Sequence, residues 1–372
     1  MKFSCEKSLL QAAISTASRA AAVKSAVPSL EGLLIEAGSE LKISGYNLKT
    51  GIITSISADV SQAGSIVLNS RLFGEIIRKL SDDIVYVNVN DDMMVNIECG
   101  MSKFNIMGFS SVDYPELPLV DYQNSISVSE KILKSIISQT NFAVSDNESR
   151  PIHTGALFEI EDGMLVVVAV DGYRLALRRE PIDEANMNGY SFVVPGAALA
   201  EVEKIVSESD KLVQITLGSK HIMFTMDNTI LISRRLEGEF LNYKNSIPKV
   251  GKFNIELDRR AIVDAVERVS LIINDKLKSP VRCIFGDGTV KLLTVTALGR
   301  ASDECKTSGD AEDLEIGFNN KYLLEALKAA PADKICIQLT SGVSPCVIVP
   351  ADSEDNSFLY MILPVRLKAN ED

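Results

Sequence analysis

The sequence predicts an α+β protein made of three copies of one domain, each with two helices and antiparallel strands. Three observations predict this class. One helical pattern of apolar residues occurs three times, a second helical pattern also occurs three times, and short alternating runs lie between them. The 372 residues are 46% hydrophobic and 24% charged, which is typical of a globular chain with material for two or three domains.

The first helical pattern starts near residue 9 and returns 123 and then a further 129 residues later. Its apolar residues recur every three or four positions, which places them on one face of an α-helix. We therefore predict helices over 6–20, 129–144 and 258–273. The copies of this face are Leu9, Leu10, Ala13, Ile14 and Ala17; Ile132, Leu133, Ile136, Ile137 and Thr140; and Ala261, Ile262, Ala265, Val266 and Val269.

The second pattern starts at Leu72 and returns at shifts of 126 and 250 residues, which predicts helices over 69–80, 195–206 and 319–330. Fourteen of its fifteen positions are apolar, and Glu203 is the exception. The copies are Leu72, Phe73, Ile76, Ile77 and Leu80; Ala198, Leu199, Val202, Glu203 and Val206; and Tyr322, Leu323, Ala326, Leu327 and Ala330. Residues suited to begin a helix precede both patterns, namely Asn69 or Ser70, Ser129 with Glu130, Pro195, Asp258 and Asn319.

Alternating runs such as 84–89 and 212–217, bounded by Gly, Asn and Asp, predict antiparallel strands between the helices. The segment after the first helix also repeats, since 32–48 matches 155–175, and 283–301 is a looser third copy. We place the domain boundaries at Asn124-Ser125 and Val250-Gly251. The predicted domains are 1–124, 125–250 and 251–372, each large enough for an independent core.

Apolar residues at helical spacing are explained by core packing alone in most helices. Core packing does not explain why one two-helix unit occurs three times at a nearly constant period. Repeats of this kind build either an open array or a closed ring, and the sequence pattern does not choose between them.

The six cysteines lack the paired spacing of a zinc site or a redox motif, so we interpret them as buried apolar residues in a reducing cytoplasm. The N-terminus has no apolar signal segment, and no stretch is long enough to span a membrane. We therefore expect a cytoplasmic protein without membrane contact. The net charge of −12 argues against a surface that is basic overall, as nucleic-acid binders usually have.

An enzyme is the first alternative, and the sequence gives it little support. The two histidines, His153 and His221, stand in no metalloprotease motif, and neither a serine-nucleophile elbow nor a P-loop is present. The short Gly/Asp segments Asp171-Gly172 and 286–288 are better interpreted as turns. We predict no catalytic residue, no metal ligand and no cofactor.

Four stretches in order resemble the β subunit of bacterial DNA polymerase III, the sliding-clamp family, and the resemblance covers essentially the whole chain. They are 104–108 followed by 113–118, then 170–176, then 316–323, and finally 360–367. Each stretch is weak evidence alone, but together they lie on a threefold repeat.

The resemblance implies that two chains close head to tail into a ring of six similar domains, with helices lining the hole. Such a ring would encircle double-stranded DNA without reading its sequence, and would tether the replicative polymerase to confer processivity. It also implies a clamp loader as a partner, together with other proteins that carry a clamp-binding motif, such as repair polymerases, mismatch-repair proteins and ligase. A repeat scaffold that binds peptide motifs but never DNA remains the alternative.

The charge distribution favours DNA, because the six predicted helices carry a net charge of +4 and leave −16 for the rest of the chain. A basic lining attracts phosphates without reading bases. Charges on helices are ordinarily just a solvated face, so each residue has this second interpretation. The candidate DNA-facing residues are Lys24, Arg71, Arg78, Lys79, Lys131, Lys134 and Arg150.

The resemblance also implies a pocket for a short linear peptide between the second and third domains. Three positions depart from the family pattern, namely His153, Leu241 and Asn245, and they put the peptide preference in question. The terminal strand has an ordinary structural role as well, since it completes a sheet, and five residues follow Leu367. The implied pocket residues are His153, Val170, Gly172, Tyr173, Arg174, Leu175, Leu241, Ser246, Val343, Pro345, Met361, Leu363, Pro364, Val365 and Arg366.

For ring closure we expect contact between the first domain of one chain and the third domain of the other. The candidates for its apolar centre are Phe104, Ile106, Leu271 and Ile272. Burial in the core of their own domain is the alternative explanation for each of them.

Overall fold

The computed structural model of the 372-residue chain describes residues 1–120, 124–182, 189–249, 251–274, 279–309, 311 and 314–367. The chain divides into two compact units, which are Met1–Lys134 with Ala200–Arg235 (unit 1) and Ser135–Leu199 with Leu236–Asp372 (unit 2). Val250, at the second predicted domain boundary, and the tail after Leu367 lie outside the described residues.

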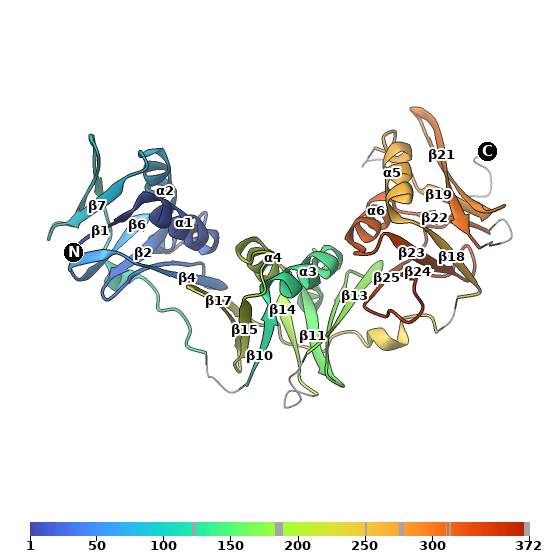
Figure 1. The fold of residues 1–372 in the computed structure, drawn as a ribbon, viewed down its shortest axis with the longest axis horizontal. Helices are drawn as coiled ribbons and strands as arrows, with labels where there is room; N and C mark the ends of the chain where they lie inside the picture. The colour runs from blue at the N-terminus through green and yellow to red at the C-terminus, as the bar shows by residue number, and fades with distance from the viewer. Residues whose placement is uncertain are drawn as a thin grey trace. The chain divides into compact units, whose positions relative to one another are not determined.

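The order of elements repeats three times as strand, helix, strands, helix, strands, which confirms the predicted fold class (Figure 1). All six predicted helices are present. They are α1 (Lys7–Ala17), α2 (Ser70–Lys79), α3 (Glu130–Thr140), α4 (Gly196–Ile205), α5 (Arg259–Ser270) and α6 (Asn320–Ala329). Short 3-10 turns follow α1 and α3, so those two α-helices end earlier than predicted.

The helices begin where capping side chains stand. The side chains of Asn69, Asp258 and Asn319 accept hydrogen bonds from backbone N–H groups in the first turns of α2, α5 and α6. The Ser129 hydroxyl accepts one from the N–H of Ile132 in α3. Each bond satisfies a donor that the helix itself leaves unpaired, which confirms these predicted starts.

Unit 1 contains two antiparallel sheets. Their strand orders are β5-β1-β7-β8-β9 and β10-β15-β16-β17-β4-β3-β2-β6. The strands are β1 (Lys2–Glu6), β2 (Gly32–Ala37), β3 (Leu41–Tyr46), β4 (Thr50–Ile56), β5 (Asp59–Gln62), β6 (Gly64–Asn69), β7 (Ile84–Val89), β8 (Met94–Cys99), β9 (Ser102–Met107), β10 (Asn124–Ser129), β15 (Leu212–Leu217), β16 (His221–Met226) and β17 (Thr229–Arg234). Strands β7 and β15 match their predicted spans.

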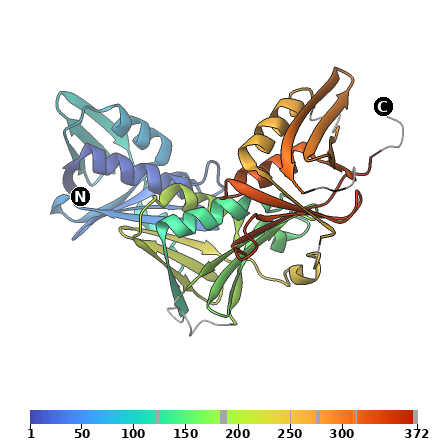
Figure 2. The ribbon, with the colours of Figure 1, turned by 45° about the vertical axis from the view of Figure 1, so that its right-hand side comes forward.

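Unit 2 contains one sheet of order β14-β11-β12-β13-β25-β24-β23-β18-β21-β20-β19-β22. Helices α5 and α6 pack against each other, and α5 lies over β18 to β21 (Figures 1 and 2). The strands are β11 (Gly155–Glu161), β12 (Met164–Val170), β13 (Arg174–Pro181), β14 (Ser191–Pro195), β18 (Phe253–Asp258), β19 (Val281–Gly286), β20 (Thr289–Thr296), β21 (Gly299–Ser308), β22 (Leu314–Phe318), β23 (Lys334–Leu339), β24 (Cys346–Pro350) and β25 (Phe358–Ile362).

Two of these pairings join different repeats. In unit 1, β4 of the first repeat pairs with β17 of the second, with Ile52 opposite Leu231. In unit 2, β13 of the second repeat pairs with β25 of the third, with Ala176 opposite Tyr360. All four of these side chains are fully buried. Adjacent repeats within each unit therefore share a continuous sheet.

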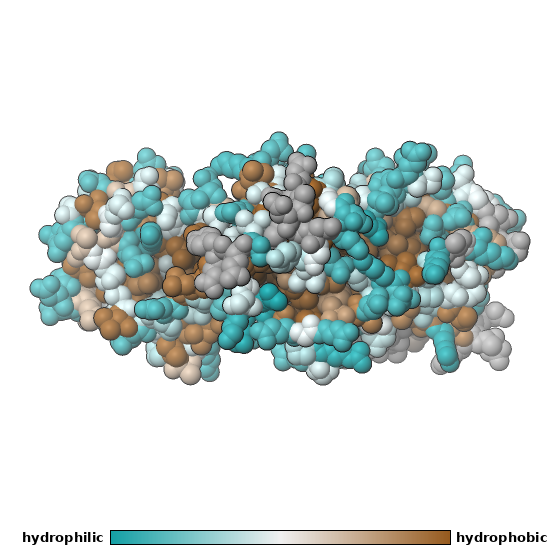
Figure 3. Space-filling model, turned by 90° about the horizontal axis from the view of Figure 1, so that it is seen from below, coloured by the Kyte–Doolittle hydropathy of each residue, from teal (hydrophilic) through white to brown (hydrophobic). Residues whose placement is uncertain are grey.

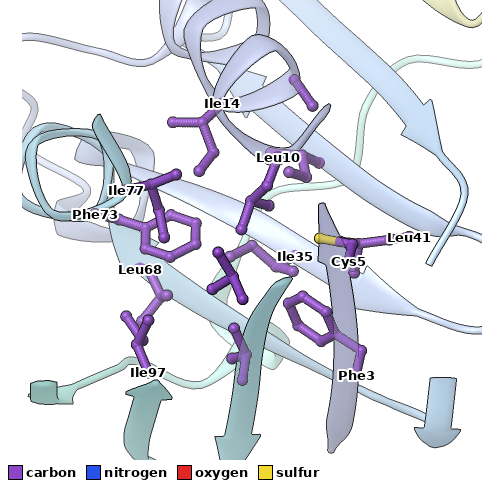
Figure 4. Close-up of a cluster of buried hydrophobic side chains, with 14 of the residues drawn as sticks. Phe3, Cys5, Leu10, Ile14, Ile35, Leu41, Leu68, Phe73, Ile77 and Ile97 are labelled. Atoms are coloured by element: carbon purple, nitrogen blue, oxygen red, sulfur yellow. The ribbon is translucent and has the colours of Figure 1, made fainter. Parts of the chain in front are cut away.

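The core of unit 1 forms where α1 and α2 cover the sheet strands (Figure 4). Leu10 and Ile14 of α1 and Phe73 and Ile77 of α2 point into one cluster that also holds Ile35. Three positions of the predicted apolar faces are exposed, namely Leu9 (41%), Leu72 (46%) and Ala261. All six cysteines are free and buried, as predicted.

A buried carboxylate anchors the segment that follows α4. Glu130 is 8% exposed and accepts hydrogen bonds from the backbone N–H of Ser207 and from the hydroxyls of Ser207 and Ser209. Burial by itself would raise the pKa of Glu130, but these hydrogen bonds, together with the charge of Lys211, bring it below its ordinary value of 4.5.

We predict that Glu130→Gln destabilises the protein at neutral pH. A carboxylate with a lowered folded-state pKa stabilises the fold above its unfolded-state pKa, and this contribution is lost as the pH falls through the folded-state pKa. The loss at pH 7 should be about 1.5–3 kcal/mol, as for hydrogen bonds to a charged group. Thermal unfolding at pH 7 and at steps below 4.5 measures it, with the exposed Glu40→Gln as the control. A difference between wild type and Glu130→Gln that does not shrink in acid would contradict the assignment.

Candidate functional site

The helices carry a net positive charge in a chain that is acidic overall. The six observed helices contain twelve Lys and Arg residues against seven Asp and Glu residues, so their net charge is +5 in a chain of −12. This agrees with the excess that the sequence predicts.

The candidate DNA-facing residues fall into two groups. Lys24, Arg71, Arg78, Lys79 and Lys131 are exposed in unit 1, together with the half-buried Lys134, whereas the exposed Arg150 belongs to unit 2. Two of them have acidic neighbours: Arg71 Nε lies 3.2 Å from Glu75, and Lys134 Nζ lies 3.2 Å from Glu208.

An open cavity of about 740 Å³ lies between α1, α2 and the segment 18–31 of unit 1. Arg71 and Arg78 line it beside Glu31 and Glu75, so its charges balance. The cavity brings two of the candidate basic residues together, but it has no excess of positive charge of its own.

The candidate peptide-binding residues combine a buried floor with exposed apolar side chains. Val170, Leu175 and Met361 are buried in one cluster, in which Leu175 pairs with Met361 across β13 and β25. Apolar side chains also reach the surface of the molecule in patches between polar ones (Figure 3). Those of the candidate set are Tyr173 (61% exposed), Leu241 (45%), Val343 (78%), Leu363 (38%) and Val365 (36%).

The remaining members of this set lie around the same strands. Gly172, Ser246 and Arg366 are exposed, while Pro345 and Pro364 are half-buried. The ring of His153 packs edge-on against Phe240, with 5.4 Å between the ring centroids, beside Leu241. Burial, together with the positive charge of Arg150, lowers the pKa of His153 from its ordinary value of 6.5.

The turn between β12 and β13 has a defined conformation. One carboxylate oxygen of Asp171 accepts hydrogen bonds from the backbone N–H groups of Tyr173 (2.9 Å) and Arg174 (3.0 Å). Gly172 has φ +91°, which a side chain would strain. The N–H of Leu363 donates to the carbonyl of Tyr173 at 2.8 Å, so the turn is joined to the chain after β25.

Arg174 differs from its neighbours because it is buried, at 7% exposed. Its guanidinium contacts Asp171, Glu325 of α6 and the carbonyl of Phe142. Its hydrogen-bonding groups therefore point into the protein, where they leave little capacity for a ligand.

The ring-closure candidates lie in two places, one on an edge strand and one after a helix. Phe104 (36% exposed) and the half-buried Ile106 are on β9, the last strand of its sheet. Leu271 (83% exposed) and the half-buried Ile272 follow the end of α5. The structure thus leaves Phe104 and Leu271 substantially exposed in the single chain.

No group of three or more His, Cys, Asp and Glu side chains in the part of the chain that the structure describes is arranged to hold a metal ion. No helix within the same ranges is long and apolar enough to cross a membrane.

Comparison with known proteins gives matches along the whole chain. The N-terminal, central and C-terminal domain models of the DNA polymerase III beta subunit match residues 1–118, 127–242 and 244–366. A beta sliding clamp of Halalkalibacterium halodurans is 33% identical over 380 residues, covering 98% of this chain and 100% of the relative. One from Staphylococcus aureus is 30% identical and covers 98% and 99%.

The chain belongs to the DNA polymerase III beta subunit family, the beta sliding clamps. Solved structures agree, since the DNA polymerase sliding clamp of Bacillus subtilis superposes with a TM-score of 0.94 at 29% identity, covering 99% of this chain and 100% of the other.

Family membership establishes the function as that of a DNA sliding clamp, a non-catalytic processivity factor in DNA replication. The family implies DNA and a polymerase as partners. The alternative of a scaffold that never binds DNA is not favoured.

Sequence reasoning missed the glutamates that this sliding clamp uses to join its repeats. Glu201 of α4 contacts Arg19 (3.3 Å), and Glu325 of α6 contacts Arg174. Together with Glu75 of α2, they follow the same shifts of 126 and 250 residues that relate the second helices. That recurrence was a usable signal, but only the structure shows which arginines they meet.

Proposed function

We propose that this chain and a second copy close head to tail into a ring around duplex DNA, and that the ring holds a replicative polymerase by a short peptide. The observation that supports ring closure best is the strand pairing between repeats, which occurs twice among the described residues and leaves two corresponding strand edges without a partner strand in that part of the chain.

The two edges are β9 and the first half of β21. Strand β9 ends its sheet. Among the residues that the structure describes, β21 pairs with β18 only through Thr307 and Ser308, so β20 is the one strand beside residues 299–304. In repeat order, β9 corresponds to β17 and β25, and β21 corresponds to β4 and β13. Because unpaired strand edges offer ready hydrogen-bonding partners, we assign β21 of one copy to β9 of the other.

The repeats also supply a register for this contact. One position of the repeat is occupied by Ile52, Ala176 and Ala301, because each pairs with the equivalent residue of the strand before it. By the same criterion, a second position is occupied by Leu231, Tyr360 and Phe104. Since Ile52 faces Leu231 and Ala176 faces Tyr360, we place Ala301 opposite Phe104 of the other copy. Its neighbour Arg300 would then face Asn105.

Two exposed leucines fit beside this pairing. Leu72 corresponds to Tyr322, and Leu271 corresponds to Phe142, by the same residue shifts that relate the helices. Tyr322 and Phe142 both pack on the Arg174 guanidinium where the second and third repeats meet. We therefore add Leu72 to Phe104, Ile106, Leu271 and Ile272 as a ring-closing residue.

For DNA we retain the basic candidates, which are Lys24, Arg71, Arg78, Lys79, Lys131, Lys134 and Arg150. The exposure of six of them, all but the half-buried Lys134, and the net positive charge of the helices support phosphate contact without base recognition. Weak, exchangeable contacts of this kind allow sliding, and a closed ring needs no tight grip because it leaves only by opening. Opening would fall to an ATP-driven clamp loader.

For the polymerase and other motif-bearing proteins, such as repair polymerases, mismatch-repair proteins and ligase, we propose the apolar surface around β13 and β25 as the docking site. A peptide tether raises the effective concentration of its partner at the template.

We keep the domain limits 1–124, 125–250 and 251–372. We also place the protein in the cytoplasm, where bacterial chromosomal DNA is replicated.

We predict that the protein is linked to DNA topologically. The protein is loaded onto nicked circular DNA with a clamp loader and ATP, isolated, and the DNA is then cut once at moderate salt. It should stay on intact circles and run off the cut DNA, because only a ring is released by free ends. Equal retention on both would mean that contact alone holds it.

Cross-linking tests ring closure. In Asn105→Cys/Arg300→Cys, mild oxidation should give a covalent dimer, because the proposed register places the two residues opposite each other and all native thiols are buried. The control Asn105→Cys/Lys306→Cys moves one thiol six residues along β21, about 20 Å, and should stay uncross-linked. Equal cross-linking of both variants would refute the register.

Substitution at the apolar surface tests the peptide site. Leu363→Glu should weaken binding of a synthetic peptide carrying a polymerase clamp-binding motif by at least about tenfold, roughly the effect of losing one buried anchor. Leu212→Glu, which alters an exposed leucine of unit 1 (65% exposed), should bind normally. Fluorescence anisotropy measures both affinities, and unchanged binding by Leu363→Glu would remove the assignment.

A further inference from the structure

The proposed peptide surface rests on a buried arginine whose contacts are all internal. Arg174 Nε donates to Asp171 at 2.9 Å, one terminal nitrogen contacts Glu325, and the other donates to the carbonyl of Phe142. A buried guanidinium needs such partners, because an unpaired charge in the interior is costly. Three segments that are far apart in the sequence therefore converge on one side chain.

Two aromatic rings complete the surroundings of Arg174. The guanidinium carbon lies 4.5 Å from the ring centroid of Tyr322 and 5.3 Å from that of Phe142. Tyr322 in turn stacks on Tyr173, with ring centroids 5.9 Å apart and planes 24° apart. Tyr173 is 61% exposed, so the stack runs from the buried arginine to the surface where the peptide is proposed to bind.

The carboxylate of Asp171 links the same arginine to the backbone of the turn. One of its oxygens holds Arg174 Nε, and the other holds the N–H groups of Tyr173 and Arg174. The carbonyl of Tyr173 then accepts from Leu363. The position of Arg174 thus affects two exposed apolar groups of the surface, Tyr173 and Leu363.

We propose that Glu325 is a positioning residue for the peptide-binding surface. It lies on α6 and is not among the residues implied by the family resemblance. By holding one end of the guanidinium, it keeps Arg174 between the two rings, which fixes Tyr322 under Tyr173 and fixes the Asp171 turn. This inference rests on the proposed peptide-binding function, since a positioned Tyr173 matters only if a ligand contacts it.

The repeat provides a matched control. Glu201 occupies the corresponding position of α4 and pairs with Arg19, whose side chain is 34% exposed. The residue that corresponds to Tyr322 there is Ala198, so no aromatic stack follows from that pair. Glu325→Gln and Glu201→Gln therefore remove the same charge from equivalent helices, but only the first should disturb the peptide surface.

The experiment uses the full-length protein and consists of two measurements. The first is the affinity, measured by fluorescence anisotropy, for a fluorescent synthetic peptide carrying a polymerase clamp-binding motif. We expect Glu325→Gln to weaken binding about fivefold, Glu325→Asp to weaken it less, and Glu201→Gln to leave it unchanged. A similar loss in Glu201→Gln, or none in Glu325→Gln, would overturn the assignment.

The second measurement reports on the position of residue 173 in the absence of peptide. Because the chain has no tryptophan, Tyr173→Trp introduces a single reporter. Glu325→Gln in this background should increase quenching by acrylamide and lower the emission anisotropy, whereas Glu201→Gln should change neither. A reporter unaffected by Glu325→Gln overturns the positioning role. Wild type that fails to bind the peptide refutes the proposed function instead, and the reporter still decides the role of Glu325.

Discussion

The last strand of a repeat pairs with a strand of a different repeat, and the remaining architecture depends on that constraint. The second repeat gives β17 to β4, and the third gives β25 to β13. In the first repeat, β9 has no such partner among the described residues. The edge that this leaves and the open half of β21 correspond to the two strands that pair within each unit. The closure by a second chain that we propose would use the same backbone hydrogen bonding that builds each unit.

The same pairing places the candidate peptide surface. Because β13 and β25 lie side by side, Leu175 and Met361 meet in one buried floor, and the chain that leaves β25 passes directly over the β12–β13 turn. A surface built at a pairing of two repeats combines residues from both without a loop of its own. The basic helices are a separate feature. Their positive charges suit weak, exchangeable contacts with the phosphate backbone of a DNA along which the clamp slides.

Much of this fold was predictable from the sequence. The apolar period of 3.6 predicted six helices, and side chains such as Asn69 and Asp258 marked where they begin, because capping is a local interaction. Alternation likewise predicted β7 and β15. The pairing of β4 with β17 was not predictable, since no local pattern specifies a partner almost 180 residues away. The exposure of Leu9, Leu72 and Ala261 was not predicted, because a helical period does not show which apolar residues of a helix face stay outside the core.

The candidate site was predicted unevenly. The resemblance supplied the residues around β13 and β25, and it implied Arg174 as a pocket residue, whereas the structure buries the Arg174 guanidinium against Asp171 and Glu325. Burial of a charge depends on partners brought from distant segments, and sequence alone does not show them. Glu130 is similar, because its hydrogen-bond donors come from the segment after α4.

Hydrogen exchange tests the central claim, that β9 and β21 pair between copies, most directly. Amide exchange is followed by mass spectrometry from dilute to concentrated protein. The account predicts that exchange in residues 102–107 and 299–304 slows together as the protein assembles, while exchange in β5, the opposite edge of the sheet that contains β9, stays unchanged. Exchange in β9 and β21 that stays equally fast at every concentration, in protein shown to be dimeric, would contradict it.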